Sequence, residues 1–244
     1  MHGFHEFRVG SSLHLLCLAI CLLATVAAAA WSFRQRRKDR PIPILRGSLV
    51  VLSLSAFALS LWANQQNPTL PWNQKLPLHL CNLANLVGSV ALVWRVRLCQ
   101  ALLYYWMFVG CVWAFVTPSL YEGIYEIEFW IFWFYHLCIP VSLAVVMTFD
   151  QWRPNWREAG IALAITVAYT MLIAVFNAAT DSNYAFVGKG DPINPSPIDV
   201  LGPYPWRVGS VIGVGSLLFA LFTLPWTIFR KRFTPALGDT LTSK

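Results

Sequence analysis

Charged side chains are scarce in this sequence. Asp, Glu, Lys and Arg make up 12% of the 244 residues, whereas an ordinary soluble domain has about 25%. Apolar residues make up 57%, and the mean hydropathy is +0.55. This composition excludes an ordinary soluble domain, a disordered chain and a collagen-like chain. It is typical of an integral membrane protein.

The sequence also lacks a cysteine framework. Its six cysteines all lie in apolar stretches and form no C-x-x-C pair, so neither a disulfide scaffold nor a zinc ribbon is indicated. A metal site remains a minor alternative, because the candidate ligands have no close spacing. These ligands are Cys81, Cys111, Cys138, His79 and His136. We expect no metal and no cofactor.

Seven apolar segments carry almost no charge, and the single charged residue within them is Arg207. Each segment is close to the roughly 20 residues that a helix needs to cross a bilayer. The sequence therefore predicts an all-α polytopic membrane protein, with one membrane domain over 1–244 and a multi-pass location in the cell membrane. The expected transmembrane helices are 12–33, 47–64, 76–94, 98–117, 129–149, 159–179 and 206–229.

Basic residues gather on one side of these segments. Fourteen of the 18 Lys and Arg residues lie in the loops after the first, third and fifth segments or in the C-terminal tail. Because loops rich in Lys and Arg stay in the cytoplasm, this distribution predicts an outside N-terminus and a cytoplasmic C-terminus. The net charge of +7 is thus a topology signal, and we expect no nucleic-acid partner.

The richest polar stretch within a segment begins the third one. Pro77 suits a first helical position, which places Cys81 about one turn into the helix, near the positive end of the helix dipole. Thiolates form more readily there. On a helical wheel Cys81 and Asn85 share a face, while His79 points away and is a poor base for the thiol.

A better base is His136 in the fifth segment, at an expected depth similar to that of Cys81. Pro140 cannot donate to the His136 carbonyl, which leaves an acceptor and space at that level. A Cys/His pair with a supporting amide can activate a thiol nucleophile. Asn85 or Asn177 could orient the imidazole or donate to an oxyanion. Packing is the alternative for each of these residues.

Several motifs resemble the YwaF-like family of multispanning membrane proteins, over about residues 45 to 230. The family has a more distant animal relative, transmembrane protein 164, an acyltransferase that loads fatty acyl chains onto ether phospholipids with a Cys and a His. The resemblance implies Cys81 as nucleophile and His136 as base. The motifs are Leu76-Pro77-Leu78-His79-Leu80-Cys81, Phe134-Tyr135-His136, Asn177 followed by Asn183-Tyr184, and Asp199-Val200-Leu201-Gly202-Pro203-Tyr204-Pro205-Trp206.

Together these features predict a membrane lipid acyltransferase or transacylase that works through a thioester. Its partners would be membrane lipids, a phospholipid or lysophospholipid, because a site near the outer face is remote from cytosolic acyl-CoA. Entry of water would make it a lipid hydrolase. The residues expected to line the substrate pocket are His79, Asn82, Tyr169, Asn183 and Tyr184.

A non-enzymatic seven-helix protein that binds or transports a lipidic ligand is the alternative. The seven segments contain no acid and no lysine, which counts against an ion-coupled transporter.

Overall fold

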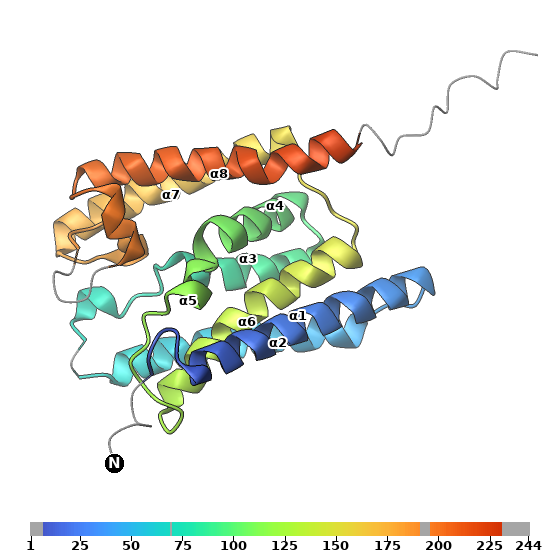
Figure 1. The fold of residues 1–244 in the computed structure, drawn as a ribbon, viewed down its shortest axis with the longest axis horizontal. Helices are drawn as coiled ribbons and strands as arrows, with labels where there is room; N and C mark the ends of the chain where they lie inside the picture. Colours follow the sequence, from blue (N-terminus) through green and yellow to red (C-terminus); the bar gives the residue numbers. More distant parts are fainter. Residues whose placement is uncertain (1–6, 69, 191–195, 231–244) are drawn as a thin grey trace, which may run out of the picture.

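A computed structural model describes residues 7–68, 70–190 and 196–230. All regular elements in this part of the chain are helices, as the sequence predicts. The helices pack in layers (Figure 1): α7 and α8 form one side, α1 and α2 the other, and α3, α4 and α6 lie between them. The longer elements are α1 (Ser12–Arg37), α2 (Pro43–Gln66), α3 (Leu80–Trp94), α4 (Arg97–Trp106), α6 (Ile127–Thr148), α7 (Trp156–Thr180) and α8 (Trp206–Arg230).

Short elements connect or interrupt these helices. A π-helical turn, η2 (Met107–Cys111), joins α4 to α5 (Trp113–Val116), so that Arg97–Val116 runs on as one helical stretch. Three 3-10 turns lie in the loops: η1 (Trp72–Gln74), η3 (Tyr184–Phe186) and η4 (Pro197–Leu201).

Among the residues that the structure describes, six helical stretches are long and apolar enough to cross a membrane, and they make this a multi-pass membrane protein. Each begins and ends within four residues of an expected segment. The third expected segment, 76–94, differs. Only Leu80–Trp94 is helical there, which is 15 residues or about 22 Å of helix. The residues before Leu80 follow a different path, which is described with the site below.

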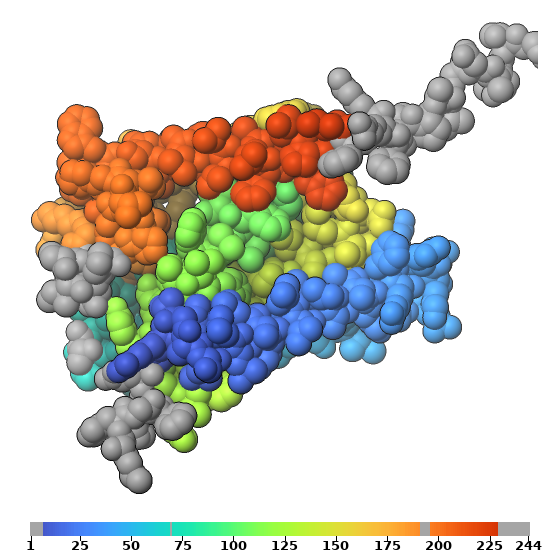
Figure 2. All heavy atoms as spheres, in the orientation of Figure 1, coloured from blue at the N-terminus to red at the C-terminus, as the bar shows by residue number. Residues whose placement is uncertain are grey.

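The outer helices expose apolar side chains. In the most apolar window of α1 only 11% of residues are buried inside the protein, against 61% in α6. Figure 2 shows α1 and α8 forming two opposite outer faces of the molecule. An apolar helix that is not covered by protein is covered by lipid in an integral membrane protein.

The core between α4 and α8 is held by aromatic rings whose polar atoms are paired. Tyr105 stacks on Phe219 with ring centroids 4.2 Å apart, and its hydroxyl shares a 2.6 Å hydrogen bond with Thr223. The Tyr104 hydroxyl donates to the Phe222 carbonyl at 3.0 Å. Buried hydroxyls need such partners, so these bonds fix how α4 and α8 face each other.

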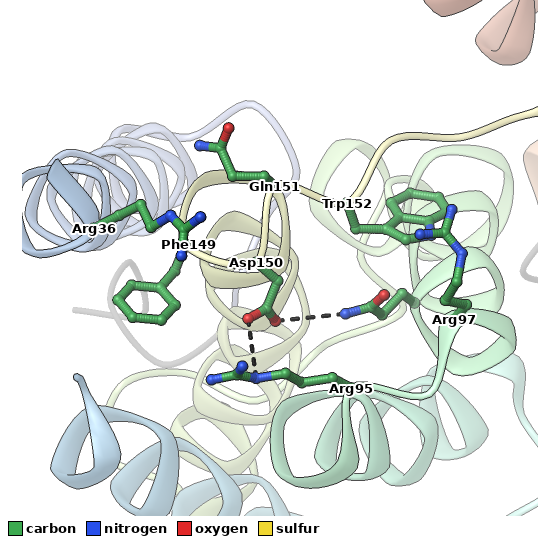
Figure 3. A pocket seen from close by; sticks show the side chains of 8 residues that line it. Arg36, Arg95, Arg97, Phe149, Asp150, Gln151 and Trp152 are labelled. Atoms are coloured by element: carbon green, nitrogen blue, oxygen red, sulfur yellow. Dashed lines mark hydrogen bonds and ion pairs between the residues drawn. The ribbon is translucent and has the colours of Figure 1, made fainter. Parts of the chain in front are cut away.

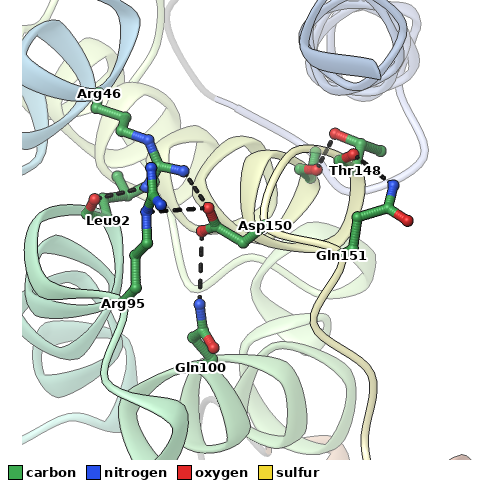
Figure 4. A network of polar contacts seen from close by, with 8 residues as sticks. Arg46, Leu92, Arg95, Gln100, Thr148, Asp150 and Gln151 are labelled. Carbon is green, nitrogen blue, oxygen red and sulfur yellow. Dashed lines mark hydrogen bonds and ion pairs between the residues drawn. The ribbon is translucent and has the colours of Figure 1, made fainter. Parts of the chain in front are cut away.

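One end of the bundle is rich in arginine, and we call it the basic end. Arg46 at the start of α2 pairs with Asp150 just after α6 and donates to the carbonyl of Leu92, near the end of α3, at 2.6 Å. Arg95 and Gln100 also reach the Asp150 carboxylate, at 3.3 and 3.5 Å (Figure 4). The network joins loops that the sequence places on one side of the membrane.

Candidate functional site

The helix that carries Cys81 begins later than expected. α3 starts at Leu80 with His79 as its N-cap, so Pro77 is not its first residue and Cys81 is the second. Leu78 N–H donates to the Leu76 carbonyl at 2.9 Å, and His79 is extended with φ −70° and ψ 148°. A hydrogen bond between residues two apart and an extended residue are both incompatible with an α-helix, so 76–79 are not helical. Cys81 therefore lies in the first turn, closer to the helix N-terminus than the sequence predicts.

The non-helical residues directly before α3 are half-buried and pack against α7 and the loop that follows it. The backbone N–H of Leu76 donates to the Tyr184 hydroxyl at 2.9 Å, and the Tyr169 hydroxyl donates to the carbonyl of Leu78 at 2.8 Å. Tyr169 is eleven residues before the end of α7, which places it roughly 17 Å from that helix end. The bond to Leu78 therefore lies within the span of α7 and not at its end. Backbone that is not helical is tolerated at membrane depth only when it has such protein partners.

His136 is buried in α6, nine residues after its start, or roughly 14 Å along the helix. Its Nδ1 lies 2.8 Å from the carbonyl oxygen of Phe132. A carbonyl can only accept, so Nδ1 carries the proton, and in the neutral ring Nε2 keeps a free lone pair. The ring also packs against the side chain of Phe132, with centroids 4.2 Å apart.

The structure brings Cys81 and His136 together. The His136 imidazole, the Cys111 thiol and the His79 ring all lie close enough to the Cys81 thiol to act on it electrostatically. Cys81 is half-buried, whereas Cys111 is fully buried. An accessible thiol beside an imidazole with a free nitrogen is an arrangement that can produce a nucleophile.

Cys111 lies near Cys81 because the helical stretch that follows α4 forms a π-helical turn, η2, at this point. The N–H of Val112 donates to the Met107 carbonyl at 2.9 Å, the wider repeat of a π-helix, and such turns occur often at functional sites. Gly110 has no side chain where a Cβ would collide with the side chain of Leu80. With a Cβ at position 110, either the Leu80 side chain or η2 would have to shift. The sequence suggests Cys111 only as a metal ligand, and Gly110 is the signal that could have identified this contact.

Asn85 is almost fully buried and serves to hold helices together. Its side-chain NH2 donates to the carbonyls of Cys81 and Tyr135, both at 3.2 Å, and its Oδ1 accepts from the Ser53 hydroxyl at 3.1 Å. Both donor hydrogens are therefore used, one within α3 and one between α3 and α6, while Oδ1 joins α3 to α2. The group that orients the His136 ring is the backbone carbonyl of Phe132 rather than an amide.

Asn177 organises the loop after α7. Its NH2 donates to the Tyr184 carbonyl at 2.9 Å, and its Oδ1 accepts from the Ser182 hydroxyl and from Tyr184 N–H, both at 2.9 Å. Asn183 likewise accepts from Gly188 N–H at 2.9 Å. These bonds place the Tyr184 ring 5.0 Å from the ring of His79. Asn177 thus holds the loop that carries Tyr184, and these side-chain hydrogen bonds all go to that loop.

The remaining expected pocket residues lie around the start of α3. The Tyr135 hydroxyl donates to Asn82 Oδ1, which joins α6 to the first turn of α3. The Tyr169 hydroxyl donates to the Leu78 carbonyl, and the rings of His79 and Tyr184 pack edge to face. Within the described residues, no three His, Cys, Asp or Glu side chains are arranged to hold a metal ion.

Comparison with known proteins gives one family match that covers the site. The model of the TMEM164 family matches residues 9–223. Over 121 residues the chain is 28% identical to an uncharacterized protein of Treponema pallidum (strain Nichols), a match that covers 48% of this chain and 49% of that protein. The chain thus spans about half the length of this curated relative. No solved structure matches the chain.

Proposed function

The chain belongs to the TMEM164 family, and we propose that it is an integral membrane lipid acyltransferase or transacylase with Cys81 as nucleophile and His136 as base. The likeness to transmembrane protein 164 inferred from the sequence motifs agrees with this membership, while the YwaF-like name stays a prediction. The observation that carries the proposal is that the Cys81 thiol lies near an imidazole whose Nδ1 is fixed by the Phe132 carbonyl.

The reaction needs two steps at this pair. His136 Nε2 takes the thiol proton, and the Cys81 sulfur attacks the ester carbonyl of a phospholipid acyl chain. The new C–S bond forms as the ester C–O bond breaks, and the imidazolium returns the proton to the leaving lysolipid alkoxide. His136 then deprotonates the hydroxyl of an acceptor lysolipid, which attacks the thioester and releases the Cys81 thiolate.

The start of α3 supplies donors for the oxyanion of each step. The first N–H groups of a helix have no intrahelical acceptor, and α3 has no side-chain cap. Among the described residues no hydrogen bond from the N–H of Leu80 or Cys81 occupies them. These two N–H groups point from the positive end of the helix, where they can stabilise negative charge on the substrate oxygen. They replace the amides that the sequence suggested for this role.

The proposed topology has seven crossings with the N-terminus outside and the C-terminus in the cytoplasm. The residues before α3 complete the third crossing as non-helical backbone, which the Tyr169 and Tyr184 hydroxyls support. The basic end then faces the cytoplasm. Cys81 lies toward the opposite end of α3, away from cytosolic acyl-CoA, so the proposed acyl donor is a membrane phospholipid.

Acyl transfer by purified protein in lipid nanodiscs tests this function. Mass spectrometry would follow a labelled acyl chain from a phospholipid to a lysophospholipid for the wild type, Cys81→Ala and His136→Gln. Cys138→Ala is the matched control, because it removes a thiol that is buried in α6, two residues after His136, and that has no role in the proposed reaction. We expect the first two variants to lose transfer and the control to retain it.

Transfer that persists in Cys81→Ala would remove the thiol mechanism. Lipid binding by the wild type without any transfer would favour the alternative, a non-enzymatic lipid-binding or transport protein. A labelled fatty acid that appears free in solution would instead identify a hydrolase that uses the same pair.

A further inference from the structure

A cavity of about 230 Å³ opens at the basic end of the bundle (Figure 3). Three arginines line it. Arg36 lies in the last turn of α1, Arg95 directly after α3, and Arg97 at the start of α4. Asp150 lies among them. From Cys81 to Arg95 is fourteen residues along the chain, roughly 21 Å of helix rise. The cavity is therefore remote from the proposed acyl-transfer site.

The cavity keeps a positive charge after its internal ion pairs are counted. Asp150 is neutralised by the buried Arg46, at 5% and 11% side-chain exposure, and receives Arg95 as a second partner. Arg97 pairs with Glu158 at 2.5 Å. Within the described part of the chain, Arg36 has an exposed side chain with no ion pair or hydrogen bond. Arg36 and Arg95 thus bring charge that the two carboxylates do not cancel.

The size and the residues of the cavity point to a small anion. Clefts for drug-sized ligands have about 300–1,000 Å³, so 230 Å³ suits a single headgroup better than a nucleotide. Arginine presents a planar fork of N–H donors that matches the oxygens of a phosphate. Gln100 also lines the cavity and adds an amide. Basic pockets between membrane helices bind anionic lipid headgroups.

We propose that this cavity binds a phosphate group, with Arg36 and Arg95 as its principal ligands, and that an anionic phospholipid headgroup is the source. The end of α1 and the loops after α3 and α6 form the cavity, so a headgroup at the membrane surface reaches it without crossing the bundle. A headgroup bound to both Arg36 and Arg95 would tie the end of α1 to the turn between α3 and α4.

Binding to the purified full-length protein in detergent tests the proposal. The probes are short-chain phosphatidylglycerol, short-chain phosphatidylcholine and inorganic phosphate, with bound lipid counted by native mass spectrometry. We expect phosphatidylglycerol to bind more tightly than phosphatidylcholine and to be displaced by inorganic phosphate. Because a hydrogen bond to a charged group is lost, Arg36→Gln should weaken phosphatidylglycerol binding about tenfold, and Arg36→Gln with Arg95→Gln should abolish it.

Arg34→Gln is the matched control. Arg34 is also exposed and lies on the last turn of α1, but two residues of helix turn its side chain about 200° away from that of Arg36. The Arg34→Gln variant therefore removes one positive charge from α1 without changing the cavity. Its binding of phosphatidylglycerol should stay within twofold of the wild type.

Each outcome separates one interpretation from the others. Inorganic phosphate that binds in the wild type and fails in Arg36→Gln, with no lipid binding, supports the site and assigns a soluble phosphate source. Equal weakening by Arg34→Gln and Arg36→Gln overturns the proposal, because it shows a diffuse basic surface. Absence of binding by every probe also overturns it. None of these results depends on acyl transfer, since the cavity contains no residue of that site.

Discussion

The ion pair of Arg46 and Asp150 gives a stability prediction that the structure makes quantitative. Both side chains are nearly buried, with 11% and 5% exposure, and Arg46 also donates to the Leu92 carbonyl at 2.6 Å. Replacing Arg46 by Met keeps a long apolar stem but removes the charge and both contacts. The change therefore leaves a buried carboxylate and a helix-terminal carbonyl with fewer partners (Figure 4).

The expected loss is about 3 kcal/mol of unfolding free energy. Removing one partner of a buried pair costs about 3–5 kcal/mol. Arg95 reduces this cost, because it still reaches Asp150 at 3.3 Å, although its side chain is 58% exposed. A double variant, Arg46→Met with Asp150→Leu, should recover at least half of the loss, since it leaves no unpaired charge in the interior.

Equilibrium unfolding by SDS in lipid bicelles, followed by tryptophan fluorescence, measures these changes. Arg97→Met is the comparison, because it breaks an ion pair in which the arginine is 62% exposed. Exposed pairs contribute about 0–1 kcal/mol. If Arg46→Met and Arg97→Met cost the same, or if the double variant is no more stable than Arg46→Met, the buried pair does not hold this end of the bundle as we infer.

Three further predictions concern the site and its loop. Gly110→Ala should displace either the Leu80 side chain or η2 beside Cys81 and lower acyl transfer by roughly tenfold, while Gly209→Ala, where a Cβ meets nothing within 4 Å, should leave transfer unchanged. Tyr169→Phe should cost about 1 kcal/mol in the same unfolding assay, because it leaves the half-buried Leu78 carbonyl before α3 without its donor; an unchanged unfolding curve would contradict this. Asp181 raises the pKa of Lys189 above its usual 10.5; a raised pKa stabilises the fold below the unfolded value and the effect disappears as pH rises through the folded value. Lys189→Met should therefore flatten the dependence of Tm on pH only above about 10.5, and an effect confined to neutral pH would refute the assignment.

The helices could be predicted because the bilayer imposes a length and excludes charge. Six stretches lie within four residues of their expected bounds. The third segment could not be predicted in the same way. Pro77 fits the rule for a helix start, but Tyr169 and Tyr184 bond the backbone of 76–78 in a non-helical path. These partners lie about 90 and 110 residues further along the chain, and no local pattern reveals them.

The roles of the polar residues were harder to predict than their positions. The sequence suggests that Cys81 and His136 share a depth, and in the structure the two side chains lie close enough to interact electrostatically; their roles in catalysis stay a prediction. Asn85 was expected to support the imidazole, but Ser53 and two backbone carbonyls occupy its amide. Cys111 enters through a π-helical turn, which no rule of helix periodicity predicts. Hydrogen-bond partners on other helices decide these roles.

The most direct test of the central claim is a search for an acyl group on Cys81. The protein would be incubated with phospholipid in nanodiscs without an acceptor, digested under acidic conditions and analysed by mass spectrometry. We predict an acyl mass on the Cys81 peptide that hydroxylamine removes, and that is missing in His136→Gln. Full acyl transfer by the same preparation with no adduct on Cys81, or with an equal adduct on Cys138, would contradict the thioester mechanism.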